Sequence, residues 1–120
     1  MENNLKTEFV TYEQALALKE LGFEWQTLNF FDSTTRDFWN WDYFPDINAP
    51  LKQQVFRWFR EKYNIIGIIE GGYTEGKNVF SYVIWQGHLD DWTDDIYKTY
   101  EEAENACIDK LISICKQQDK

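Results

Sequence analysis

The chain has 120 residues, of which 43% are hydrophobic and 18% aromatic, and its formal net charge is −9. This length predicts a single domain over residues 1–120 with a sizeable core and a flexible N-terminus at residues 1–8. The negative charge argues against direct nucleic-acid binding, because phosphate groups repel an acidic protein. The first residues lack a signal-peptide pattern, and no apolar run is long enough to cross a membrane, so we expect a cytoplasmic protein.

The first predicted helix begins at a capping box, Thr11 followed three residues later by Gln14. In this motif the threonine hydroxyl accepts from the Gln14 N–H while the glutamine side chain reaches back to the threonine N–H. Apolar residues then repeat on one side as far as Leu21, and Gly22 is a typical residue just beyond a helix end. The sequence therefore predicts a helix over residues 11–21.

Two strands are predicted next, over residues 24–31 and 38–44, joined as a hairpin by a polar loop. In the second strand Trp39, Trp41 and Tyr43 share one face, because side chains alternate along a strand. Exposed aromatic side chains along a strand could bind a protein partner, a planar ligand or a base. If helices cover this face, the same residues belong to the core.

A strongly amphipathic segment predicts a second helix over residues 49–63. Asn48 is a good N-cap residue for it and Pro50 suits the first turn. Lys52, Arg57 and Arg60 lie on the predicted outer face and could contact a phosphate group. We favour an ordinary exposed helix face, neutralised by the acidic segment later in the chain.

A second hairpin follows, with strands over residues 64–70 and 78–86 and a glycine-rich turn at 71–76. The nearly continuous isoleucine run in its first strand is typical of a central strand. Alternation in the other strand places Ile84 and Trp85 on opposite faces.

An acidic loop over residues 87–95 is expected to lead to the last helix, which starts at a second capping box, Thr99 and Glu102, and ends near Lys116. Residues 90–104 hold seven acidic side chains and one lysine. This density predicts an acidic surface that includes Asp90, Asp91, Asp94, Asp95, Glu101 and Glu102.

No catalytic residue, metal site or cofactor is predicted. His88 stands beside the acidic residues, but the spacing fits no calcium loop, so a solvated loop is favoured over a cation site. Cys107 and Cys115 would lie about 12 Å apart along the last helix, too far for a disulfide, and are predicted to be free thiols. A thiol–imidazole pair of Cys107 with His88 is disfavoured, because Cys107 lies in mid-helix on an apolar side.

Taken together, the elements predict an α+β fold with the order α-β-β-α-β-β-α. In this arrangement two hairpins form one antiparallel sheet, and three helices pack on it.

The three predicted helices resemble a group of small uncharacterised proteins of phages and prophage-like elements of gut Bacteroidetes. The resemblance lies in residues 9–23 (FVTYEQALALKELGF), 49–63 (APLKQQVFRWFREKY) and 99–107 (TYEEAENAC). It implies a mobile-element origin and the cytoplasm of a host cell. No activity is assigned to the group, so the resemblance implies no functional residue.

Three functional hypotheses follow. The first is a non-enzymatic acidic binding or accessory protein of a phage or prophage, which contacts a protein partner through the partly exposed aromatic face of Trp39, Trp41 and Tyr43. One form of it is an inhibitor whose acidic surface mimics nucleic acid or covers a basic site of a host factor. The second is a small-ligand or nucleotide-binding domain, in which the strand aromatics stack on the ligand and Arg57 or Arg60 neutralises a phosphate. A small enzyme is the least supported, because no nucleophile or acid–base pair stands out.

Overall fold

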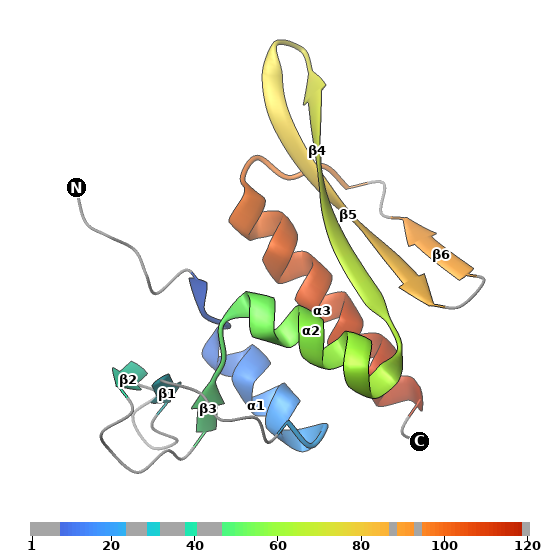
Figure 1. The fold of residues 1–120 in the computed structure, drawn as a ribbon. Helices are drawn as coiled ribbons and strands as arrows, with labels where there is room; N and C mark the ends of the chain where they lie inside the picture. The colour runs from blue at the N-terminus through green and yellow to red at the C-terminus, as the bar shows by residue number, and fades with distance from the viewer. Residues whose placement is uncertain are drawn as a thin grey trace. The chain divides into compact units, whose positions relative to one another are not determined.

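Figure 1 shows the computed structural model of the chain, which describes residues 8–23, 29–31, 38–40, 47–86, 89–92 and 95–118. Contacts between Cα atoms divide the chain into two compact units, Met1–Val55 and Phe56–Lys120, and each is considered by itself. The expectation of a single domain stays a prediction. The described elements are, in chain order, α1 (Tyr12–Glu20), β1 (Asn29–Phe31), β2 (Phe38–Asn40), β3 (Ile47–Ala49), α2 (Lys52–Tyr63), β4 (Ile66–Thr74), β5 (Lys77–Gln86), β6 (Leu89–Trp92) and α3 (Tyr100–Gln118).

The predicted order α-β-β-α-β-β-α with one sheet is wrong, although the elements are of the α+β class. The described strands form two separate three-stranded sheets, with strand orders β2-β1-β3 and β4-β5-β6. The sequence prediction missed β3 and β6, which are both edge strands. Strand β3 has three residues, INA, and β6 has four, LDDW, so neither is long enough to show an apolar alternation.

Helix α1 has the ends that the sequence predicts. The Thr11 N–H donates to Oε1 of Gln14 at 2.9 Å, and the Gln14 N–H donates to Oγ1 of Thr11 at 3.2 Å, which completes the capping box. Beyond the helix, Gly22 has a φ of 96°, and the Phe23 N–H donates to the Leu18 carbonyl at 2.9 Å. This is the Schellman pattern, in which a left-handed glycine closes the helix.

The start of α2 differs from the prediction. Asn48 is paired with β1 as part of β3, and Pro50 precedes the helix instead of opening it. The Pro50 carbonyl accepts from the Val10 N–H at 3.1 Å, and this pairing with the segment before α1 keeps the backbone extended. The helix then begins at Lys52, where the Leu51 N–H donates to Oε1 of Gln54 at 2.9 Å.

In the second unit, α3 packs against β4 and β5. A Cβ atom added to Gly67 of β4 would meet Cys107 and Leu111 of α3 and Phe56 of α2, so both helices lie on the Gly67 face of the sheet. The buried apolar side chains of this unit are Phe56, Trp58, Phe59, Ile65, Tyr82, Val83, Ile84, Ala103, Cys107, Ile108, Leu111, Ile112 and Cys115.

The second predicted hairpin is confirmed, but its strands are longer than expected. The antiparallel register runs from Ile66 opposite Trp85 to Thr74 opposite Lys77. Only Glu75 and Gly76 form the turn, with φ values of 50° and 78°, as a two-residue type I′ hairpin requires. The predicted turn over 71–76 is therefore wrong. Figure 1 shows this hairpin reaching past the start of α3.

The start of α3 keeps half of its predicted capping box. The Glu102 N–H donates to Oγ1 of Thr99 at 3.1 Å, while the Glu102 carboxylate accepts from the Thr99 hydroxyl at 3.1 Å. Among the described residues, no helix has the length and apolar character needed to cross a membrane.

Candidate protein-interaction surface

Large apolar side chains are exposed on the sheet face that lies opposite the Gly67 face. Ile66 is 39% exposed, Ile68 is 42% exposed and Trp85 is 40% exposed. Ile66 pairs with Trp85 across β4 and β5, and paired residues of an antiparallel sheet project to the same side. We call these three residues the open face.

The position of the open face follows from the alternation of the two strands. The helices cover the face that carries Gly67 and its cross-strand partner Ile84, which is buried. Ile66 and Ile68 are the chain neighbours of Gly67, and Trp85 is the neighbour of Ile84. Because neighbouring side chains of a strand project to opposite faces, these three residues project away from both helices. Val83 of the central strand β5 lies opposite Ile68 on the same face, and its side chain is buried. An apolar cluster of this kind on a sheet surface is typical of an interaction site.

Acidic positions border the open face. Glu70 lies on the same side, two residues beyond Ile68, and it is exposed. On the other side of β5, Asp90 of β6 occupies the register position beside Trp85, and Asp91 the position beside Ile84. Asp90 and Asp91 are thus in an edge strand, which corrects the predicted loop over 87–95. The open face therefore has Glu70 on its own side and, at the register position beside Trp85, the acidic residue Asp90.

Three other predicted acidic residues lie just before α3 or in its first turn. Asp95, Glu101 and Glu102 are exposed, and Asp94 falls outside the described residues, as does His88. In the part of the chain that the structure describes, no group of three or more His, Cys, Asp or Glu side chains is placed to hold a metal ion.

The aromatic face of the first hairpin remains a prediction. Trp39 is in β2, opposite Phe30 of β1, as the predicted hairpin requires. Trp41 and Tyr43 lie outside the described residues. Trp39 belongs to the first unit and the two arginines of the proposed nucleotide site belong to the second, so neither unit holds that site by itself.

The two arginines lie on an ordinary helix surface. Nε of Arg57 is 3.3 Å from Oε1 of Glu61, one turn along α2, and both side chains are exposed. Arg60 is also exposed. Lys52 is buried, so the prediction that it lies on the outer face of the helix is wrong. A surface ion pair of this spacing adds little stability and partly neutralises the guanidinium. The partner of Arg57 is therefore on its own helix, whereas the sequence pointed to the later acidic segment.

The cysteines are free thiols buried in α3, as predicted. Burial, together with the smaller effect of the nearby Glu104 carboxylate, raises the pKa of the Cys107 thiol from 9.0 to about 12. The thiolate is the reactive form of cysteine, and an uncharged thiol without solvent access is chemically inert. The Cys107 side chain therefore acts as a small apolar group of the core.

This burial predicts that the folded protein resists thiol reagents. At pH 8 we expect both cysteines to react with an aromatic disulfide reagent at least about a hundredfold more slowly than an exposed thiol. The matched control is Ser113→Cys, at an exposed position of the same helix. Addition of denaturant should release the two native thiols together, and rapid labelling of either one in the folded protein would contradict their burial.

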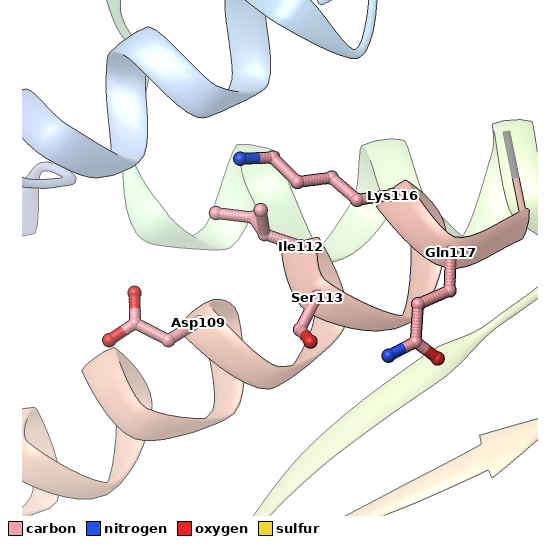
Figure 2. Close-up of a pocket in the computed structure, with 5 residues that line it drawn as sticks. All are labelled: Asp109, Ile112, Ser113, Lys116 and Gln117. Atoms are coloured by element: carbon pink, nitrogen blue, oxygen red, sulfur yellow. The ribbon is translucent and has the colours of Figure 1, made fainter. Parts of the chain in front are cut away.

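A pocket of about 410 Å³ lies along α3 (Figure 2) and is lined by Asp109, Ile112, Ser113, Lys116 and Gln117. Figure 2 shows the Ile112 and Lys116 side chains, one turn apart, extending to the same side of the helix. The volume suits a small molecule, but a ligand site normally gathers polar groups from several elements. Because all five residues come from one helix, the pocket is a weaker candidate than the open face.

The sequence prediction missed the open face because the isoleucine run suggests a central strand. Among the strands that the structure describes, β4 pairs with β5 alone and is an edge strand. The sequence signal that could have revealed the open face was Gly67 between Ile66 and Ile68. A glycine lets a helix pack closely on its own face of the strand, so its two isoleucine neighbours project to the other face. In β5 the predicted opposition of Ile84 and Trp85 is confirmed, with Ile84 buried and Trp85 exposed.

Comparison of the chain with protein-family models, with curated proteins and with solved structures gives no match.

Proposed function

We propose that this chain is a non-enzymatic acidic binding protein of phage or prophage origin, which acts in the host cytoplasm by contact with a protein partner and inhibits a host factor. The observation that carries the proposal is the open face, where Ile66, Ile68 and Trp85 are exposed together on one side of a sheet. The phage origin is supported by the resemblance of the three helical segments.

The chemistry of the open face supports a protein partner. Aromatic and branched apolar side chains at the centre of a surface, surrounded by polar groups, are the usual composition of a protein–protein contact. Trp85 provides the largest contact area of the three residues, since a tryptophan buries a large apolar surface on binding. A partner that covers this face would therefore gain most of its binding energy from Trp85 and the neighbouring isoleucines.

The charge of the chain supports a basic partner. The net charge is −9, and the open face is bordered by Glu70 and, in register beside Trp85, by Asp90. Complementary charge accelerates association and disfavours acidic partners. The binding surface of the partner should therefore combine apolar residues with lysine or arginine.

The proposal is tested by affinity capture with matched variants. Wild-type protein, an Ile68→Thr/Trp85→Gln double variant and a Leu16→Gln control are immobilised and exposed to a Bacteroidetes lysate. Leu16 is suited to the control because it is 39% exposed, like the residues of the open face, but belongs to α1 of the first unit. The retained proteins are quantified by mass spectrometry.

We expect the double variant to retain the partner at least about tenfold less than wild type, because two central contact residues are removed. The Leu16→Gln control should retain it unchanged. Retention should also fall as sodium chloride rises from about 0.05 M to about 0.5 M, since salt screens the opposite charges. Equal retention by all three proteins, or insensitivity to salt, would contradict the proposal.

A further inference from the structure

Strand β4 presents an open backbone edge beside the open face. It is nine residues long, Ile66–Thr74, and within the described residues it pairs with β5 alone. The N–H and C=O groups on its outer side therefore pair with none of the described strands. Such a row of backbone groups is a template on which another extended segment can pair.

The two edges of this sheet differ in how they discourage pairing. Strand β6 has four residues, and two of them are Asp90 and Asp91. Short length and charged residues are common means of keeping an edge strand from pairing with other chains. Strand β4 is longer, lacks proline and lysine, and carries a single charge, Glu70. The unprotected edge is thus the one that adjoins Ile66 and Ile68.

Charge decides which kind of strand fits this edge. Ile66, Ile68 and Glu70 follow one another at every second position, so they lie on the same face. Glu70 is exposed and sits opposite the neutral Ser81 of β5. A second copy of β4 offers no basic residue to Glu70, since IGIIEGGYT contains neither lysine nor arginine. A partner strand with a lysine or arginine at that register position would supply the missing charge.

We propose that β4 binds an extended segment of the partner protein as an added antiparallel strand of the β4-β5-β6 sheet. Apolar residues of the segment lie beside Ile66 and Ile68, and a lysine or arginine lies beside Glu70. Antiparallel pairing makes the better-aligned backbone hydrogen bonds. The inference rests on the proposed function, because it names the part of the partner that the open face receives.

The test uses a defined peptide and the full chain. The probe contains Lys-Thr-Val-Thr-Val, which in antiparallel register places lysine beside Glu70 and the valines beside Ile68 and Ile66. Binding is measured by fluorescence anisotropy of the labelled peptide, and the backbone contact by amide hydrogen exchange. On addition of the peptide, we expect new protection at alternate residues within 66–70, the part of β4 that the peptide covers, because only every second amide of a strand faces its outer edge.

A charge-reversal pair separates register-specific contact from general attraction. Glu70→Lys and Glu75→Lys change the net charge equally, but Glu75 is in the hairpin turn and outside the paired segment. We expect Glu70→Lys to weaken binding of the lysine peptide roughly fivefold, as expected for one cross-strand charge pair, and Glu75→Lys to have a much smaller effect. A peptide with glutamate in place of lysine should prefer the Glu70→Lys variant.

Four results would overturn the inference. They are failure of the peptide to bind, absence of new protection in β4, equal loss in the two charge variants, and concentration-dependent dimerisation that protects β4 without peptide. In the last case the occupant is a second copy. The affinity capture above is unaffected by these results, because a partner could cover Trp85 without adding a strand. Failure of the inference and failure of the proposed function are therefore distinguishable.

Discussion

Replacement of Phe59 by alanine is expected to lower the free energy of unfolding by about 3–5 kcal/mol. Phe59 is fully buried in α2, and its ring lies 5.1 Å from the ring of Trp58 and 6.0 Å from that of Tyr63, centroid to centroid. Truncation removes the apolar contacts of the ring and leaves a cavity that a close-packed core fills only in part. Because a small protein is stable by about 5–15 kcal/mol in total, this change alone could unfold much of the population.

The effect is measured by urea denaturation followed by far-ultraviolet circular dichroism. Tyr73→Ala is the matched control, since Tyr73 is a similar aromatic residue but is 73% exposed on β4. We expect its unfolding free energy to change by less than about 0.5 kcal/mol. Phe59→Leu should give an intermediate loss, because leucine restores part of the volume. Similar losses for Phe59→Ala and Tyr73→Ala would contradict the described core.

Gly67→Ala is expected to destabilise the protein by about 1–3 kcal/mol, although it adds only one methyl group. The added Cβ atom would lie 2.8 Å from Sγ of Cys107, 3.1 Å from Cδ1 of Leu111 and 3.1 Å from Cε1 of Phe56. These atoms are in buried side chains of two helices, so relief of the overlap requires the strand or a helix to move. The same urea titration measures the loss.

Two further variants show whether close packing is the cause. Gly71→Ala changes the same residue type on the same face of β4, but its Cβ atom would have no neighbour within 4 Å. Its effect should be neutral or slightly stabilising, because alanine restricts the unfolded chain. Cys107→Ala removes the nearest atom and should partly offset the cost of Gly67→Ala in the double variant. Equal costs for the two glycine variants would exclude packing at Gly67 as the cause.

Gly67 also connects core packing to the candidate surface. Because it has no side chain, α2 and α3 approach that face of β4 closely. The neighbouring Ile66 and Ile68 then project to the opposite side, where they remain exposed with Trp85. The structure that buries Cys107 and Leu111 thus leaves the open face available for a partner.

The sequence by itself determined the features that depend on neighbours a few residues away. The capping box of Thr11 and Gln14 and the stop at Gly22 place α1, and the bond from the Glu102 N–H to Thr99 marks the start of α3. These signals can be read from the sequence because each hydrogen bond closes within three to five residues. The spacing of Cys107 and Cys115 likewise predicted two free thiols.

Only the tertiary structure decided where the sheets end and which surfaces they expose. Strand β3 exists because it pairs with β1, and β6 exists because it pairs with β5, while neither strand has a strong apolar pattern of its own. The isoleucines of β4 are compatible with a central or an edge strand until the neighbouring strand is known. Which isoleucines become core depends on which face of the sheet α2 and α3 cover, and α3 lies far along the chain. Pairing and burial are long-range properties, so the open face emerges only when the chain is folded.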